Sequence, residues 1–252
     1  MIVVKTKPEV EKMRRAGDLV ARTLDLVEQA VRPGITTGEL DRLAEDFIRS
    51  HGAQPAFKGY LNYPATLCIS INDEVVHGIP GKRPLTEGQI VSIDVGVCLD
   101  GWYGDSARTL CIGDAGPEAK DLLETTKEAL RRGVEQARAG NRLGDISAAV
   151  QTFAEEKGYS VVRDLVGHGI GRQMHEEPQV PNFGIPHTGV GLKAGMVLAI
   201  EPMVNIGGSA ITFDADKWTV RTADGSLSAH FEHTVAITDN GPDILTVVVL
   251  KG

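Results

Sequence analysis

An internal repeat constrains the fold of this chain more than any other feature of its sequence. Residues 85–94 match residues 192–201 position for position without a gap, and each segment leads into an apolar strand that carries an acid, Asp94 or Glu201. Similarity at this scale predicts two related halves, each made of two helices followed by strands. Chance similarity in a glycine-rich chain is the alternative. The repeat is favoured because an acid recurs at the same place within an apolar strand.

The first half contains a predicted β-hairpin whose turn is Asp100-Gly101. An Asp-Gly pair between alternating apolar runs is the strongest short-range hairpin signal. A two-residue turn places Asp94 opposite Ala107, so Asp105 lies on the same face two residues along. The two carboxylates are then diagonal neighbours, with Cβ atoms roughly 7 Å apart or somewhat less. A loop one residue longer would place the two aspartates on opposite faces of the hairpin, and one of them would face solvent.

Composition and charge narrow the class of protein. The 252 residues are enough for one large or two small domains with a substantial core. A net charge of -8 disfavours nonspecific binding to nucleic acid or to an anionic membrane, whereas affinity for cations is easier to support. No apolar run reaches the length of a membrane span, and the N-terminus lacks the apolar core of a secretion signal. We therefore expect a soluble, cytoplasmic protein.

Capping and periodicity signals predict four helices. The segments 6–9 and 36–39 both fit capping boxes, and apolar residues follow each of them at helical spacing. The predicted helices span 6–31, 36–52, 117–139 and 143–157. Besides the hairpin, strands are predicted at 67–71, 159–162, 196–205, 210–213, 218–221, 228–238 and 244–250. A long loop is expected at 165–192, and its histidines favour a functional role.

Four acids lie in segments predicted to be buried strands. If the two halves pack about a pseudo-twofold axis, Asp94 meets Glu201 and Asp105 meets Glu232. Four buried carboxylates cannot all stay ionised without cations, so two divalent metal ions would resolve the arrangement. His168, flanked by glycines that permit close approach, is a candidate for a further ligand. One imidazole with four carboxylates suits manganese, iron, cobalt or zinc.

The order of these five residues, with GIGRxxHEEP after His168 and LSAxxEHT around Glu232, resembles the type I methionine aminopeptidases. That resemblance implies an α/β (α+β) pita-bread fold, in which two pseudo-twofold-related halves form a curved antiparallel sheet flanked by helices. It implies a single domain over residues 1–252, with halves of roughly 1–115 and 116–252. The implied activity is removal of the initiator methionine from nascent proteins when the next residue is small.

The resemblance also assigns roles to the ligands. Asp94 would hold one metal ion, His168 the other, and Asp105 and Glu232 would bridge the two. Glu201 would be a ligand and would also handle the proton of the attacking water. Glu201 and Glu232 are 31 positions apart, which leaves no room for the helical insertion of the second subclass. The absence of an N-terminal zinc-finger extension suggests the bacterial form.

Substrate-binding positions follow from the same resemblance. His77 in VVHGIP and His175 in MHEEP match two histidines that contact the scissile amide. A core residue with its hydrogen bonds satisfied, or a surface residue, is the alternative for any lone histidine, and it is preferred for His187, His230 and His233. The methionine pocket is expected to be formed by Phe57, Tyr60, Tyr63, Cys68, Met174 and Trp218, for which ordinary core packing is the alternative.

Two pocket positions depart from the pattern of the family. Met174 stands where bacterial relatives often carry an aromatic residue, and Phe57 stands where some carry a cysteine. These departures concern the shape of the pocket and leave the chemistry unchanged. Asn72 and Ser228 match positions near a monovalent-cation site. Ribosome docking and a monomeric state are further implications.

Two other functions compete with this interpretation. A proline-specific peptidase of the same fold would usually carry an additional N-terminal domain, for which this chain has no room. A metal-free protein-binding module of the same fold is disfavoured because all five ligand positions are intact.

Overall fold

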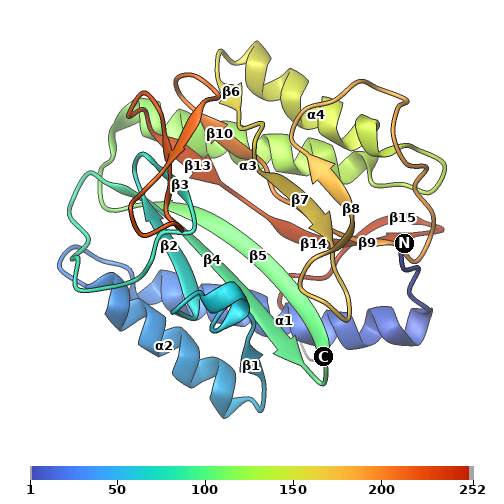
Figure 1. Ribbon diagram of the computed structural model, residues 1–252, viewed down its shortest axis with the longest axis horizontal. Helices are drawn as coiled ribbons and strands as arrows, with labels where there is room; N and C mark the ends of the chain where they lie inside the picture. The colour runs from blue at the N-terminus through green and yellow to red at the C-terminus, as the bar shows by residue number, and fades with distance from the viewer. Residues whose placement is uncertain (1, 250–252) are drawn as a thin grey trace.

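The computed structural model describes residues 2–249, and all four predicted helices are present within that range (Figure 1). They are α1 (Lys7–Ala30), α2 (Thr37–Ser50), α3 (Gly116–Gln136) and α4 (Leu143–Glu156). The capping box at the start of α2 is reciprocal, because Glu39 N donates to Thr36 Oγ1 at 3.2 Å and Thr36 N donates to Glu39 Oε2 at 2.8 Å. Pairs of this kind satisfy amide groups that the first helical turn leaves free.

Within residues 2–249, the strands form four antiparallel sheets. The first half contributes β1 (Gln54–Pro55), β2 (Leu67–Ile71), β4 (Ile90–Leu99) and β5 (Trp102–Cys111), with β3 (Glu74–Val76) and the 3-10 helix η1 (Tyr60–Asn62) beside them. The second half contributes β6 (Ser160–Val161), β7 (Val166–Gly169), β8 (Glu176–Pro181), β9 (Val197–Ile200), β10 (Met203–Asn205), β11 (Ile211–Phe213), β12 (Val220–Thr222), β13 (Ser228–His230), β14 (His233–Thr238) and β15 (Gly241–Ile244).

The β4–β5 hairpin has the predicted register. Asp94 pairs with Ala107 and Gly96 pairs with Asp105, so the two aspartates lie on one face of the hairpin. The turn residues Asp100 and Gly101 both have positive φ, 53° and 75°, as a tight two-residue hairpin turn requires. The alternative of a longer loop is therefore wrong.

The two halves meet along β5 and β14. Glu232 N donates to Ala107 O at 3.0 Å, and Thr234 Oγ1 donates to Asp105 O at 2.8 Å. Ser106 Oγ also donates to Glu232 O at 2.5 Å. These contacts bring the acid-bearing segments of the two halves together at the middle of the molecule.

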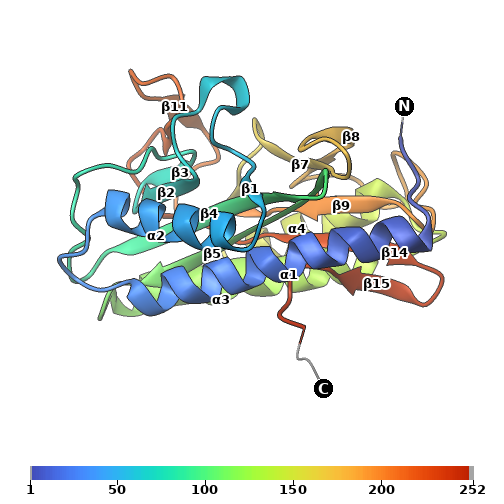
Figure 2. The same cartoon turned by 90° about the horizontal axis from the view of Figure 1, so that it is seen from below.

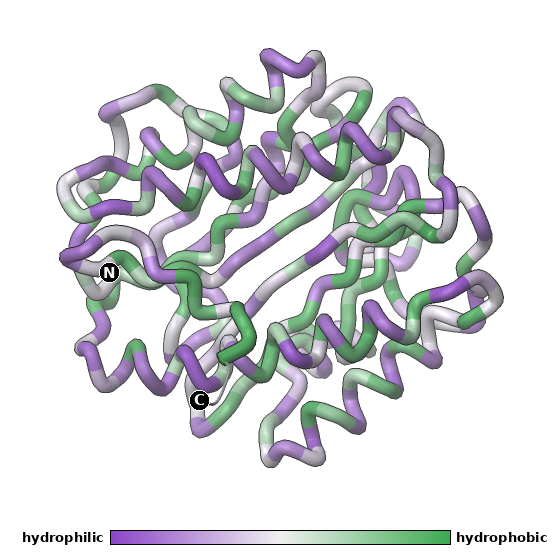
Figure 3. The backbone as a smooth tube through the Cα atoms, turned by 180° about the vertical axis from the view of Figure 1, so that it is seen from behind, coloured by the Kyte–Doolittle hydropathy of each residue, from purple (hydrophilic) through white to green (hydrophobic). Residues whose placement is uncertain are grey.

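Each half has its own hydrophobic core, and the two cores are built in the same way. In the first half, Val20 of α1 and Leu40 of α2 pack with Ile93 of β4, and in the second half Leu130 of α3 packs with Leu198 of β9. Complete burial of one such side chain stabilises the fold by about 1.5–3 kcal/mol. Figure 2 shows α1 and α3 on one side of the strands, with η1, β7, β8 and β11 on the other. Hydrophilic and hydrophobic stretches alternate along the helices in Figure 3, as expected of amphipathic helices.

Several predicted strand limits were wrong. The segment 165–192 is not a continuous loop, because it contains β7 and β8, which pair with each other and, through β7, with β9. The strand predicted at 244–250 is β15, which ends at Ile244, because a turn after Thr238 starts the pairing with β14 earlier. Residue 250 lies outside the described residues. The segment 218–221 begins its strand only at Val220.

Two other predicted strands are interrupted. The segment 196–205 is divided into β9 and β10 at Glu201-Pro202, since a proline nitrogen cannot donate to a strand ladder. The segment 228–238 is divided into β13 and β14 at Phe231-Glu232. Both glutamates therefore lie at breaks between strands. None of the helices in residues 2–249 is long and apolar enough to cross a membrane.

Candidate active site

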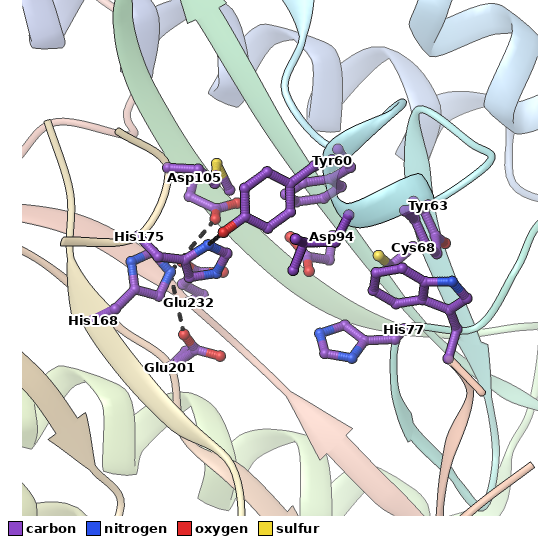
Figure 4. A pocket seen from close by; sticks show the side chains of 14 residues that line it. Tyr60, Tyr63, Cys68, His77, Asp94, Asp105, His168, His175, Glu201 and Glu232 are labelled. Atoms are coloured by element: carbon purple, nitrogen blue, oxygen red, sulfur yellow. Dashed lines mark hydrogen bonds and ion pairs between the residues drawn. The ribbon is translucent and has the colours of Figure 1, made fainter. Parts of the chain in front are cut away.

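One cavity of about 370 Å³ brings together every residue that the sequence nominated for the site. It lies between the two halves, and Figure 4 shows Asp105, His168, His175, Glu201 and Glu232 together on one side, with Tyr63, Cys68 and His77 on the other. Leu61, which the sequence did not nominate, also lines it and is 71% exposed at its rim. The lining residues are Phe57, Tyr60, Leu61, Tyr63, Cys68, His77, Asp94, Asp105, His168, Met174, His175, Glu201, Trp218 and Glu232.

The acids of this cavity are held in a setting that disfavours their charge. Burial raises the pKa of Asp94 to about 7. Burial, together with repulsion from Glu232 and Asp94, raises the pKa of Asp105 well above its usual value. Burial and neighbouring carboxylates also raise the pKa values of Glu201 and Glu232. Carboxylates in this arrangement either retain protons or require cations.

His168 on β7 faces the acids with one ring nitrogen. Its Nδ1 lies 2.8 Å from Gly169 O and donates to that carbonyl, which leaves Nε2 with a lone pair. Nε2 lies 3.9 Å from Asp105 Oδ2 and 3.7 Å from Glu201 Oε1, as the dashed lines in Figure 4 show. Burial lowers the pKa of His168 to about 3, so the ring is neutral. A neutral imidazole fixed in this way has the form that binds metal ions.

The donor set fits divalent metal ions. Ligand atoms of Asp105, His168 and Glu232 all lie within 4.8 Å of one another. Asp94 Oδ1, Asp105 Oδ1 and Glu232 Oε1 are buried and have no hydrogen-bond partner among the described residues. Buried polar atoms are normally satisfied, and carboxylate oxygens accept but do not donate when ionised. Cations would satisfy all three atoms at once.

Two further histidines lie beside the acids. His77, in a left-handed conformation with φ 61°, has its ring centroid 6.2 Å from that of Trp218. Burial, followed by repulsion from His175, lowers its pKa to about 4. Nδ1 of His175 lies 2.9 Å from the Tyr60 hydroxyl, and the ring centroids of His175 and His168 are 4.2 Å apart. Both rings border the space above the acids.

Apolar side chains line the other side of the cavity. The Tyr63 ring packs edge-on against Trp218, with the ring centroids 5.0 Å apart. The Tyr63 hydroxyl lies within hydrogen-bond distance of the Leu67 and Gly78 carbonyls. Cys68 and Met174 are buried beside them. Burial raises the pKa of the Cys68 thiol well above its usual value, so the side chain is an uncharged, sulfur-bearing wall. The three cysteines are all free.

The segment that carries Met174 and His175 is fixed by a contact that the sequence did not reveal. Lys5 Nζ lies 2.7 Å from Glu176 Oε2, and both side chains are buried. The other oxygen, Oε1, accepts hydrogen bonds from the main-chain nitrogens of Arg172 and Gln173 at 2.8 and 3.2 Å. The Glu176 carboxylate therefore organises the loop between β7 and β8.

The three histidines assigned to ordinary positions differ from one another. His187 is exposed, with its Nδ1 3.2 Å from Asp145 Oδ1. His233 Nδ1 lies 2.8 Å from Thr246 Oγ1. His230 is 1% exposed, and neither of its ring nitrogens has a hydrogen-bond partner among the described residues. The expectation of an ordinary core residue with its hydrogen bonds satisfied is therefore wrong for His230.

A buried cluster of acids and a neutral histidine, placed in a cavity that also has apolar walls, is typical of a divalent-metal-binding enzyme. The model of "Metallopeptidase family M24" matches residues 11–239, and the chain belongs to this family. The chain is 56% identical to a methionine aminopeptidase of Clostridium perfringens, an alignment that covers 98% of this chain and 100% of the relative. It is 52% identical to methionine aminopeptidase 1 of Bacillus subtilis, with 98% and 100% covered.

A solved structure supports the same assignment. The crystal structure of methionine aminopeptidase from Rickettsia prowazekii superposes with a TM-score of 0.97 at 47% identity, with 98% of this chain and 100% of that chain covered. The predicted pita-bread fold and the predicted family are therefore confirmed. Membership in a metallopeptidase family, together with the cluster of acids and His168, indicates divalent metal binding.

Proposed function

We propose that this chain is a methionine aminopeptidase, which removes the N-terminal methionine from peptides whose second residue is small. The observation that carries this proposal is the single cavity in which a metal-binding acid cluster adjoins an apolar, sulfur-lined pocket. The methionine aminopeptidases among its relatives, at 52–56% identity, support the same substrate.

The proposed enzyme binds two divalent ions in this cavity. Asp94 would hold one, His168 the other, with Asp105 and Glu232 shared and Glu201 as a further ligand. Manganese, iron, cobalt or zinc suits a set of one imidazole and four carboxylates. When bound, such ions supply a Lewis acid for the scissile carbonyl and lower the pKa of the attacking water.

The remaining chemistry belongs to side chains of this chain. Glu201 accepts the proton of the attacking water and passes it to the leaving amine, a role that suits a carboxylate whose pKa is raised by burial. His77 and His175 contact the scissile amide, and each neutral ring presents one N–H to oxygen that gains negative charge. The Tyr60 hydroxyl, 2.9 Å from His175 Nδ1, orients that ring.

The apolar end of the cavity would hold the methionine side chain. Phe57, Tyr60, Tyr63 and Trp218 offer ring edges and faces, while Cys68 and Met174 offer polarisable sulfur. Each thioether–aromatic contact stabilises the complex by about 0.3–1.5 kcal/mol. Several such contacts would favour methionine over side chains that lack sulfur.

A monovalent cation is proposed near Asn72 and Ser228. Ser228 N donates to Asn72 O at 2.9 Å, and Ser228 Oγ is buried without a hydrogen-bond partner among the described residues. We also propose a single domain with halves of about 1–115 and 116–252 that acts as a cytoplasmic monomer on nascent peptides, with docking to the ribosome. The proline-specific peptidase and the metal-free binding module are not favoured by the relatives.

A pair of peptides tests the proposed function. Purified protein with manganese should release methionine from Met-Ala-Ser and leave the corresponding Met-Lys peptide intact. Asp105→Ala should lose metal binding and activity together, whereas Asp114→Ala, at an exposed acid, should lose neither. Equal cleavage of both peptides, or cleavage only before proline, would contradict the proposal.

A further inference from the structure

His230 is a buried polar side chain without a satisfied ring nitrogen. It ends β13, is 1% exposed, and does not line the cavity. Both Nδ1 and Nε2 lack hydrogen-bond partners among the described residues. An imidazole that buries two polar atoms without partners costs free energy, so its position calls for a compensating contact.

The main chain of His230 is fixed on both sides. His230 N donates to Thr109 Oγ1 at 2.9 Å, and Thr109 Oγ1 donates to His230 O at 2.7 Å. Ser92 Oγ lies 2.8 Å from the same Thr109 hydroxyl, and β10 pairs with β13 so that Met203 lies opposite His230. These contacts hold the end of β13 in place. They therefore set the direction in which the His230 ring projects.

That direction leads to Glu201. His230 Nε2 lies 3.7 Å from Glu201 Oε2, and His168 Nε2 lies 3.7 Å from the other oxygen, Oε1. The Glu201 carboxylate is thus placed between two imidazoles. His168 approaches it from the cavity, and His230 approaches it from the protein interior.

We propose that His230 is a positioning residue that donates its Nε2–H to Glu201 Oε2 and so turns Oε1 toward the space beside His168. This inference rests on the proposed roles of Glu201 as a ligand and proton carrier. The 3.7 Å separation shortens to about 3 Å by a small rotation of the Glu201 side chain, and such contacts commonly tighten when a site is filled. Hydrogen bonds of this kind fix the orientation of metal ligands.

Two substitutions of His230 separate the effect of its hydrogen-bond donor from the effect of its side-chain shape. His230→Gln keeps an N–H donor, and His230→Leu removes it while retaining an apolar side chain. We expect His230→Leu to weaken manganese binding, measured by titration calorimetry, by about 10–100-fold, with a fall in kcat larger than any change in KM for Met-Ala-Ser. His230→Gln should restore most of both quantities.

His233→Leu is the matched control. It removes a nearby histidine that bonds to Thr246 rather than to an acid, and should leave manganese affinity unchanged. Wild-type manganese affinity in His230→Leu, or an equal loss in the Gln and Leu variants, would overturn the proposal. If His230→Leu does not fold, His230→Met replaces it with the same expected loss. Calorimetry requires no peptide cleavage, so a failure of the proposed peptidase activity would be seen separately.

Discussion

Lys5 Nζ lies 2.7 Å from Glu176 Oε2, and this ion pair joins the N-terminal segment to the loop that carries His175. The two residues are 171 positions apart in the sequence. Their side chains are 2% and 8% exposed, so neither charge can be solvated if its partner is removed. The main chain is fixed as well, because Lys5 N donates to Gly195 O at 2.7 Å. The pair therefore links the stability of the fold to the geometry of the cavity.

Loss of this pair should be costly. Lys5→Met leaves the Glu176 charge buried, and breaking a buried ion pair in this way destabilises a protein by about 3–5 kcal/mol. Urea unfolding of the variant should show this loss, and kcat/KM for Met-Ala-Ser should fall because Met174 and His175 become mobile.

An exposed lysine provides the control for this prediction. Lys120 pairs with Asp114 at 2.6 Å, but their side chains are 56% and 77% exposed. Lys120→Met should therefore leave the urea midpoint close to the wild-type value. A loss of stability in Lys5→Met as small as that in Lys120→Met would show that the buried pair has no special role.

The four buried acids should make the metal-free protein less stable as pH rises from about 4 through about 7, whereas the buried histidines, whose pKa values are lowered by burial, contribute the opposite change below about pH 6.5. The pKa values of Asp94, Asp105, Glu201 and Glu232 are all raised in the folded state, that of Asp94 to about 7. The folded state therefore keeps protons that the unfolded chain has released. The stability from these groups is fully present below the unfolded pKa values and is lost as pH rises through the folded ones.

Urea midpoints measured with a chelator between pH 5 and 8 test this dependence. Asp105→Asn removes one of the four acids and leaves the histidines in place. The wild-type midpoint should therefore fall relative to that of Asp105→Asn as pH rises, and added manganese should restore the wild-type midpoint because the ion binds the ionised acids. A difference between the two midpoints that does not change with pH would contradict the prediction.

His175 should affect catalysis without affecting metal binding. Its ring borders the acids and bonds to Tyr60, but it is not among the three residues whose ligand atoms cluster within 4.8 Å. Loss of one donor to a developing oxyanion commonly lowers kcat by about 10²–10³-fold. His175→Ala should show that loss while calorimetry gives wild-type manganese affinity. Weaker manganese binding would mean that His175 belongs to the ligand set.

Local signals predicted the hairpin, while the other half of the site depended on contacts that no short segment contains. The Asp-Gly turn fixes the register of β4 and β5, so the common face of Asp94 and Asp105 followed from the sequence. The strand breaks at Glu201 and Glu232 were not predicted from the sequence, although Pro202 indicates the first of them.

Contacts between distant segments were beyond the reach of pattern analysis. The strands β7 and β8 lie in a glycine- and proline-rich segment whose strand character arises from pairing with each other and with β9. The Lys5–Glu176 pair and the unsatisfied ring of His230 likewise arise from tertiary packing. The sequence could identify these residues as charged or ionisable, but it could not reveal their partners.

Gly96 leaves space for the side chains of Phe57 and Met174 at the wall of the cavity. It lies on β4 opposite Asp105, and a Cβ atom at this position would lie 2.7 Å from Phe57 Cε1 and 3.0 Å from Met174 Cε. Gly96→Ala should push both side chains into the space proposed for methionine. Overpacking of this kind costs about 1–3 kcal/mol, which predicts a rise in KM for Met-Ala-Ser of about 10-fold or more with manganese affinity unchanged.

Gly81→Ala is the matched control, because a Cβ atom there has no neighbour within 4 Å. It should leave KM at the wild-type value. A second peptide tests whether the effect of Gly96→Ala comes from pocket size. Norleucine-Ala-Ser has a first side chain of similar length and width that lacks the sulfur. Its KM should rise by the same factor in Gly96→Ala, because the added methyl group reduces the space for either side chain. A variant with unchanged KM for both peptides would place the methionine side chain elsewhere in the cavity.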